Sequence, residues 1–234
     1  MEAIILAGGI GTRLHSVVKD FAKPMALVNG KPFLQYILNN LLKNDVTLFI
    51  LSVGYKYKEI QDYFGDEYRS TPIDYAFEEI PLGTGGGIRE SLELAHNSPV
   101  FVLNGDTFFD VDLDNLKRTH CNSGADVTLA VKQKDDLSRY GSVLFDETGR
   151  LIAFKEKSCG KNGYINGGVY VMNKDLFTPF PLTSPFSFET DFMEVYINDL
   201  NIRVLPCDAY FIDIGVPRDY YKARQELMAF DDKY

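Results

Sequence analysis

The first half of the chain alternates short apolar runs with amphipathic segments. The apolar runs lie at residues 3–7, 48–53, 73–77, 100–103 and 127–131. Each is typical of a parallel strand that is buried on both faces. Helical spacing of apolar residues follows at 33–42, behind Pro32, and more weakly at 57–64, 88–95 and 113–121. Strands and helices in repetition predict right-handed crossovers and a Rossmann-like, doubly wound α/β sheet.

After about residue 135 the pattern changes to short alternating segments, at 142–145, 151–155 and 165–172, separated by Gly, Asn and Asp turns. They predict a mixed or antiparallel flap over one end of the parallel sheet. Three prolines make residues 178–187 a loop, and the last helix is expected over 217–229. We therefore expect a single domain over 1–234, with a first part of about 1–135 and a smaller β-rich lobe of about 136–234.

Charge and cysteine content narrow the class of protein. The 24 basic and 33 acidic side chains give a net charge of −9 in 234 residues, which argues against nucleic acid or a membrane surface as partner. There is no basic leader and no long apolar stretch, so a cytoplasmic location is expected. Three widely spaced cysteines predict buried free thiols rather than disulfides or a zinc site. The many Phe and Tyr residues would make a homodimer unsurprising.

The most informative motif follows the first predicted strand and reads Leu6-Ala7-Gly8-Gly9-Ile10-Gly11-Thr12-Arg13-Leu14. A glycine-rich turn at the carboxyl end of a strand lets backbone N–H groups approach a phosphate. Leu14 stands where a dinucleotide fingerprint has its third glycine, and the Gly-Lys-Ser/Thr of a P-loop is missing. Arg13 and the later Lys23 concentrate positive charge that suits a triphosphate. The alternative is a tight turn beside two solvated cations.

Further motifs follow in order: Lys23-Pro24, Pro81-Leu82-Gly83-Thr84-Gly85-Gly86, Asn104-Gly105-Asp106, Glu156-Lys157, Asn166-Gly167-Gly168, Ser187-Phe188-Glu189 and Asp213-Ile214-Gly215. Together with the glycine loop, this series resembles the sugar-1-phosphate nucleotidyltransferases over nearly the whole chain. The resemblance implies their GT-A-like fold and the transfer of a nucleoside monophosphate from an NTP to a sugar 1-phosphate. The first part of the chain would bind the nucleotide and the second part the sugar phosphate. No C-terminal β-helix domain is expected.

Within that family the chain is most similar to the D-glycero-α-D-manno-heptose 1-phosphate guanylyltransferases. This implies GTP and the heptose 1-phosphate as substrates, and a product used for capsule or lipopolysaccharide. A mannose-1-phosphate guanylyltransferase, or another hexose-1-phosphate uridylyl-, cytidylyl- or thymidylyltransferase, is the alternative. A nonenzymatic nucleotide-sugar sensor is a remote one, because the charged groups expected for catalysis are present. A nicotinamide oxidoreductase would need the complete glycine fingerprint.

The resemblance also assigns roles to residues. The catalytic residues would be Arg13, Lys23 and Asp106. The nucleotide would contact Leu6, Ala7, Gly8, Gly9, Gly11, Thr12, Arg13, Lys23, Gly83, Thr84, Gly105 and Asp106. The sugar phosphate would contact Tyr140, Gly141, Glu156, Lys157, Asn166 and Gly167, with Glu189 and Arg218 at the rim. Asp106 and Asp213 would bind Mg²⁺, and two carboxylates facing a triphosphate are what such chemistry demands.

Other residues favour structural roles. Asp110, Asp112 and Asp114 lack the Gly and Glu of a calcium loop, which leaves a solvated turn and a helix cap. Residues 83–87 are too rich in glycine for a helix interior and could be a mere hinge. The resemblance implies that they form a loop lining the nucleobase and ribose pocket. His96 and His120 fall near predicted helix ends and are expected at the surface or as capping residues.

Overall fold

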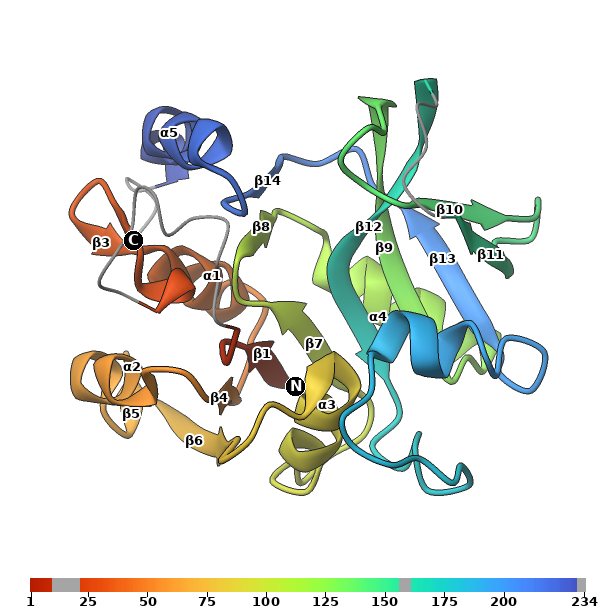
Figure 1. Cartoon of the computed structure of the whole chain (residues 1–234), viewed down its shortest axis with the longest axis horizontal. Helices are drawn as coiled ribbons and strands as arrows, with labels where there is room; N and C mark the ends of the chain where they lie inside the picture. Colours follow the sequence, from red (N-terminus) through yellow and green to blue (C-terminus); the bar gives the residue numbers. More distant parts are fainter. Residues whose placement is uncertain (10–21, 156–160, 231–234) are drawn as a thin grey trace.

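A computed structural model describes residues 1–9, 22–155 and 161–230. Within this part of the chain ten strands form one large mixed sheet (Figure 1). They are β1 (Glu2–Leu6), β4 (Leu48–Val53), β5 (Glu67–Tyr68), β6 (Thr71–Phe77), β7 (Val100–Asn104), β9 (Val127–Asp136), β10 (Ser142–Phe145), β11 (Leu151–Lys155), β12 (Lys161–Met172) and β13 (Ile202–Pro206). Two small ribbons pair β2 (Leu27–Val28) with β3 (Lys31–Pro32), and β8 (Thr107–Phe109) with β14 (Phe211–Asp213).

The parallel part of the sheet has the order β6-β4-β1-β7. The chain runs outward from β1 to β4 and β6, and then returns to β7 on the other side of β1. The strand order therefore reverses between β1 and β7, and such a switch point opens a crevice at the carboxyl ends of the two strands. The predicted mixed, doubly wound sheet is confirmed.

The second half of the chain extends the same sheet with mainly antiparallel strands. β12 is antiparallel to β7, β9 and β10, and β10 is antiparallel to β11. β13 adds a parallel strand beside β9. The predicted flap is thus continuous with the central sheet, because the long strand β12 pairs with β7 at one end and with β10 at the other. Figure 1 shows β10 and β11 at the edge away from β6.

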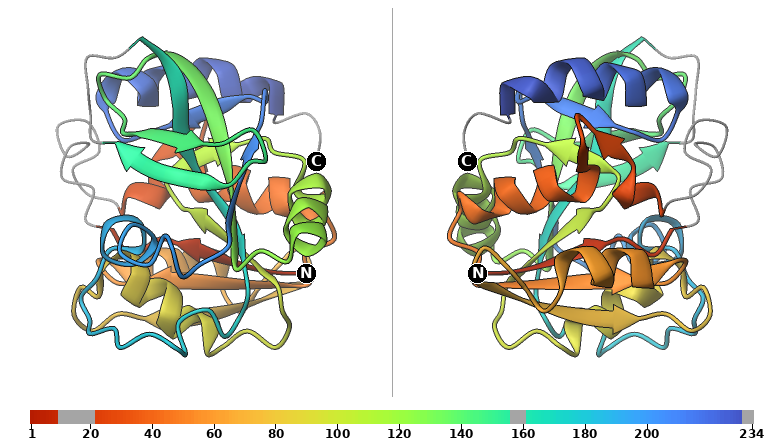
Figure 2. Two further views of the ribbon diagram at one scale, coloured as in Figure 1. Left: turned by 90° about the vertical axis from the view of Figure 1, so that its right-hand side faces the viewer. Right: turned by 90° about the vertical axis from the view of Figure 1, so that its left-hand side faces the viewer.

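Alternate side chains of the strands point into two separate cores. Ala3 and Ile5 of β1 join one core, which also contains apolar residues of α1 (Phe33–Leu42), α2 (Tyr57–Phe64), α4 (Leu113–Ser123) and α5 (Pro217–Glu226). Ile4 points to the opposite core, formed with α3 (Gly83–Leu92) and a π-helical turn, η3 (Phe188–Met193). Helical elements therefore cover both faces, as the buried strands of a doubly wound sheet require (Figure 2).

The prediction of a loop at residues 83–87 is wrong, because α3 begins at Gly83 and contains the glycines that follow. Tertiary packing explains the helix. A Cβ on Gly85 would lie 2.2 Å from the Phe186 ring, and one on Gly83 would lie 2.4 Å from the Phe186 carbonyl oxygen. Glycine lets α3 pack directly on the segment that carries Phe186, and this contact outweighs the poor helix propensity.

Three smaller predictions need comment. His120 lies in the last turn of α4 as expected but is buried, where it bonds Thr128 and Asn173 and serves the core rather than the surface. Cys121 is exposed and Cys207 is partly buried, so the prediction of buried thiols is wrong for Cys121. Cys121 is the residue after the buried His120 and does not lie on the buried face of α4. Cys159 lies outside the described residues. Asp112 caps α4 through the Asn115 N–H at 2.8 Å, which confirms its structural role.

Among the described residues, no helix has both the length and the apolar character needed to cross a lipid bilayer.

Candidate active site

The carboxyl ends of β1 and β7 meet at the switch point. Leu6 is paired with Asn104, and the Gly105 N–H donates a hydrogen bond of 2.9 Å to the Leu6 carbonyl oxygen. A Cβ on Gly105 would lie 2.6 Å from that oxygen, so the close approach requires glycine. Beyond these strand ends lies a cavity of about 780 Å³. This volume is in the range of small-molecule sites.

The cavity collects most of the predicted nucleotide-binding residues that the structure describes. Its lining includes Leu6, Gly8, Gly9, Lys23, Gly83, Thr84 and Asp106. Ala7 and Gly105 lie beside them in the backbone, and both are buried. Gly11, Thr12 and Arg13 lie outside the described residues.

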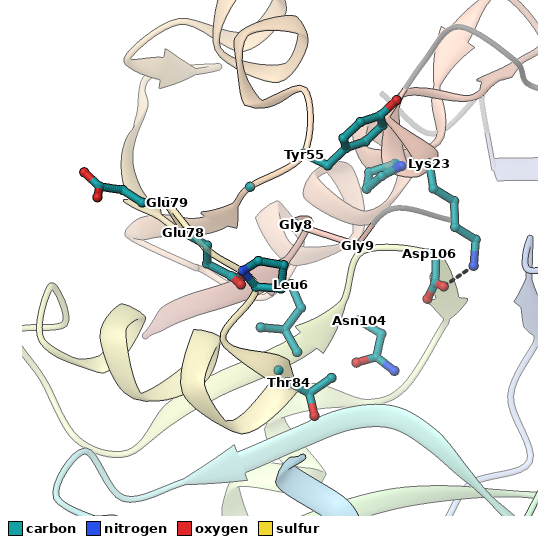
Figure 3. Close-up of a pocket in the computed structure, with 14 residues that line it drawn as sticks. Leu6, Gly8, Gly9, Lys23, Tyr55, Glu78, Glu79, Thr84, Asn104 and Asp106 are labelled. Atoms are coloured by element: carbon teal, nitrogen blue, oxygen red, sulfur yellow. Dashed lines mark hydrogen bonds and ion pairs between the residues drawn. The ribbon is translucent and has the colours of Figure 1, made fainter. Parts of the chain in front are cut away.

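The glycine loop forms a wall of the cavity at close quarters. A Cβ on Gly8 would lie 2.9 Å from Glu78 Oε1 and 3.2 Å from the Gly54 nitrogen, whereas one on Gly9 would meet nothing within 4 Å. Figure 3 shows these glycines between Lys23 and Asp106 at one end of the cavity and Glu78 and Glu79 at the other. This arrangement fits a ligand that has an anionic group at one end and a hydrogen-bonding group at the other.

Lys23 and Asp106 form an ion pair at the first end of the cavity (Figure 3). Lys23 is held by the short turn that follows the glycine loop, and its side chain is only 11% exposed. Asp106 immediately follows the β7–Gly105 turn, and its second oxygen accepts a hydrogen bond of 3.2 Å from Thr107 Oγ1. A desolvated ammonium beside a carboxylate can hold both a phosphate and a divalent cation.

Asp213 approaches the same point from the other end of the chain. β14 pairs with β8 so that Asp213 faces Thr107, and the Ile214 N–H donates to the Asp106 carbonyl oxygen at 3.0 Å. A Cβ on Gly215 would lie 2.6 Å from Asp213 Oδ1 and 3.4 Å from Lys23 Nζ. The two carboxylates predicted as metal ligands therefore approach one another near Lys23, which forms its ion pair with Asp106.

This donor set fits Mg²⁺. Two carboxylates supply hard oxygen ligands, and Mg²⁺ in phosphate sites takes its remaining ligands from water and from substrate phosphates. No group of three or more His, Cys, Asp or Glu side chains that could enclose a metal by themselves occurs in the described part of the chain. A cation at Asp106 and Asp213 would thus depend on a phosphate ligand to complete its coordination.

The predicted sugar-side residues divide into two groups. Tyr140 donates its hydroxyl to Asp213 Oδ2, and Arg139 lies 3.5 Å from the same oxygen and pairs with Asp219. Burial, and then the hydrogen bond to Asp213, raise the pKa of Tyr140, so this hydroxyl keeps its proton and remains a donor. Tyr140 therefore holds the carboxylate in this structure.

Asn166 and Gly167 lie on β12. The Asn166 amide donates to the Tyr170 hydroxyl at 2.6 Å and accepts the Gly168 N–H at 3.0 Å. A Cβ on Gly167 would lie 2.5 Å from the Phe109 ring, and one on Gly141 would lie 2.8 Å from the Lys155 carbonyl oxygen, so packing within the protein requires both glycines. Glu156 and Lys157 lie outside the described residues.

Several lining residues were not predicted, notably Tyr55, Glu78, Glu79, Pro81 and Asn104. A signal for them existed. In a parallel sheet the segments that follow neighbouring strands open at the same edge. The segments after β4 and β6 contain Tyr55, Glu78 and Glu79, and these could have been read as walls of the same crevice.

Comparison with known proteins gives consistent relationships. Residues 2–229 match the nucleotidyl transferase family. The chain is 49% identical over 221 residues to the D-glycero-α-D-manno-heptose 1-phosphate guanylyltransferase of Campylobacter jejuni, covering 94% of this chain and 97% of that protein. It is 46% identical over 230 residues to the enzyme of the same name from Aneurinibacillus thermoaerophilus, covering 98% and 100%. The crystal structure of HddC from Yersinia pseudotuberculosis complexed with GMP-PN superposes with a TM-score of 0.85 at 36% identity, covering 97% of this chain and 99% of that one.

Proposed function

The chain belongs to the nucleotidyl transferase family, and from this membership we propose that it transfers a guanylyl group from GTP to D-glycero-α-D-manno-heptose 1-phosphate, giving GDP-heptose and pyrophosphate. The observation that carries the proposal is the sequence identity of 46–49% to two heptose 1-phosphate guanylyltransferases over almost their full length. The cavity at the switch point supports it, because it combines a glycine loop, a cation and carboxylates. We place the reaction in the cytoplasm, in the supply of heptose for capsule or lipopolysaccharide.

The reaction joins two polyanions. An oxygen of the sugar phosphate attacks the α-phosphorus of GTP in line, and the bond from that phosphorus to the bridging oxygen breaks to release pyrophosphate. The attacking oxygen is already anionic at neutral pH, so no general base is needed. Mutual repulsion opposes the reaction, and catalysis should therefore come from positioning and charge neutralisation.

Lys23 is the described residue best suited to that task. Its ammonium is largely withdrawn from water, which strengthens its interaction with phosphate oxygens. It would draw the α-phosphate and the incoming phosphate together. Arg13 is expected to stabilise the departing pyrophosphate and Lys157 to receive the sugar phosphate. Asp106 and Asp213 would hold Mg²⁺, whose charge neutralises phosphate oxygens when it is bound.

Glu78 would select guanine at the other end of the cavity. Its Oε1 accepts from Ser52 Oγ at 3.1 Å and its Oε2 accepts from the Leu82 N–H at 3.1 Å, so the carboxylate is fixed in place. A carboxylate has about four acceptor sites, which leaves two for a ligand. Guanine presents adjacent N1–H and N2–H donors that can fill both, whereas uracil and thymine present a single N–H between two carbonyl oxygens.

The test is a measurement of pyrophosphate release with Mg²⁺ across GTP, UTP, CTP, dTTP and ATP, each with heptose-, mannose- and glucose-1-phosphate. We expect turnover with GTP and heptose 1-phosphate well above that of every other pair. Turnover with another pair would support the proposed nucleotidyl transfer but show that the substrate is a different one. Folded protein that is inactive with all pairs would refute the proposed transferase reaction for these substrates.

A further inference from the structure

Glu189 connects the nucleotide side of the cavity to the sugar side through hydrogen bonds. Its Oε1 accepts the Tyr170 hydroxyl at 2.8 Å, and its Oε2 accepts the Thr84 hydroxyl at 3.2 Å. Thr84 lines the cavity in the first turn of α3. Tyr170 contacts Asn166, the amide expected to face the sugar. One carboxylate on η3 therefore bonds residues of β12 and α3 that are 86 positions apart in the chain.

The Tyr170 branch fixes which way the Asn166 amide faces. Tyr170 is fully buried, and this burial, followed by the charge of Glu189, raises its pKa well above the ordinary value of 10, so the hydroxyl keeps its proton. Because that proton is donated to Glu189, the Tyr170 oxygen can only accept, and it accepts from Asn166 Nδ2. A flipped amide would set its oxygen against the Tyr170 oxygen and its NH₂ against the Gly168 N–H. The remaining amide proton and lone pair thus have one defined orientation.

The Thr84 branch fixes the first turn of α3. The Phe188 N–H donates to Thr84 Oγ1 at 2.9 Å, and the Thr84 hydroxyl proton is then directed to Glu189. The negative charge of Glu189 lies near the N-terminus of α3, where it is electrostatically favourable. Gly83 and Thr84, which line the cavity, are held against η3 by these contacts.

We propose that Glu189 is a positioning residue that orients Asn166 toward the sugar through Tyr170 and the first turn of α3 toward the nucleotide through Thr84. The inference rests on the proposed function, because its two branches lead to Asn166 and Thr84, which are expected to contact the sugar phosphate and the nucleotide of that reaction. It moves Glu189 from the rim of the site, where the sequence suggested it, to a link between the two binding regions.

The test separates the two branches. Glu189→Gln keeps the shape but supplies an amide that can donate to Tyr170, so the direction of the hydrogen bonds is no longer fixed. We expect KM for the sugar 1-phosphate to rise about tenfold, the scale of one hydrogen bond to a charged group, and the Kd for GTP to rise several-fold. Tyr170→Phe should raise the sugar KM and leave the Kd for GTP unchanged. Thr84→Val should raise the Kd for GTP, with Thr84→Ser restoring it.

Glu194→Gln is the matched control, because it removes the same charge from an exposed side chain beside η3. It should leave KM, Kd and kcat unchanged. If Glu189→Gln leaves KM and Kd within twofold of the parent values, or if both branch variants change the two constants alike, the positioning role is refuted. Should one variant fail to fold by thermal melting, the other branch still gives a decisive measurement. Loss of transferase activity in the unmutated chain would instead refute the proposed function.

Discussion

Replacement of Asp106 by Asn should separate catalysis from stability. The substitution removes one negative charge and keeps the size of the side chain and an oxygen that can accept from Thr107. In the proposed reaction it replaces one of the two anionic carboxylate ligands for Mg²⁺ with a neutral amide. We expect kcat to fall by about 10²-fold or more, the scale of losing one preorganised electrostatic contact at a transition state, which corresponds to about 2.7 kcal/mol.

The expected cost to folding is much smaller. The Asp106 side chain is 36% exposed, and ion pairs with such access to water are worth about 0–1 kcal/mol. Asp213 Oδ1 lies 2.6 Å and Lys23 Nζ 3.4 Å from the point where a Cβ of Gly215 would stand, so a second carboxylate lies near the ammonium without a direct ion pair between these two described residues. For a domain of this size, 1 kcal/mol corresponds to about 2–4 °C in Tm. The Tm of Asp106→Asn should therefore fall by no more than about 4 °C.

The assay is pyrophosphate release with saturating GTP, heptose 1-phosphate and Mg²⁺, together with a thermal melt of the same samples. Asp114→Asn is the control, because Asp114 is an exposed residue in the first turn of α4 and loses the same charge. Near-normal turnover of Asp106→Asn would refute the role given to this carboxylate. A large fall in Tm alongside the loss of turnover would attribute the effect to folding.

Three further predictions concern selectivity and stability. Glu78→Gln should lower the ratio of kcat/KM for GTP to kcat/KM for UTP by about tenfold or more, because an amide cannot accept both guanine donors. An unchanged ratio would exclude Glu78 as the residue that selects the base. Gly85→Ala should lower the free energy of unfolding by about 1–3 kcal/mol in urea titrations, and adding Phe186→Leu should recover part of this loss. If the effects of the two substitutions on the free energy of unfolding simply add, the Phe186 ring is not the obstacle. Burial favours a raised pKa for Glu2, but hydrogen bonds from the His96 backbone and from Asn97 lower it overall. The stabilising contribution of ionised Glu2 should thus be present above pH 4.5 and lost as the pH falls through the lowered pKa. The difference in urea midpoint between the parent chain and Glu2→Gln should therefore shrink in acid. A difference that stays constant with pH would contradict this.

The regular part of the fold could be predicted because its signals are local. The helix at Tyr57–Phe64 and the strands at Ser142–Phe145 and Leu151–Lys155 have the predicted boundaries, since apolar spacing and turn residues act over a few positions. The glycine-rich start of α3 could not be predicted, because its glycines are explained by Phe186, which lies about one hundred residues later; the rest of α3 overlaps the helix predicted at 88–95. The same holds for His120, whose partner Asn173 follows the end of β12, 53 residues later.

The candidate site divides in the same way. The glycine loop follows the first strand directly, so its place at a strand end could be inferred from the sequence, and Lys23 was expected near it as a concentration of positive charge. The approach of Asp213 to Asp106 depends on pairing between β8 and β14, and no local pattern encodes it. It was expected only from the resemblance to a family. To predict Glu78 as a site residue would have required both the strand order and the hydrogen bonds that its carboxylate accepts from Ser52 and Leu82.

The charge distribution explains how a chain of net charge −9 can serve two anionic substrates. At the switch point the carboxylates of Asp106 and Asp213 are each paired with a cation, Lys23 and Arg139 respectively. Each of these two carboxylates has a cationic partner, although Arg139 is shared with Asp219, so the repulsion that an acidic surface would impose on a phosphate is reduced here. A phosphate with its divalent cation adds both signs of charge and can exchange partners with these pairs. Electrostatic selection of the substrate thus depends on the arrangement of these charged side chains rather than on the net charge of the protein.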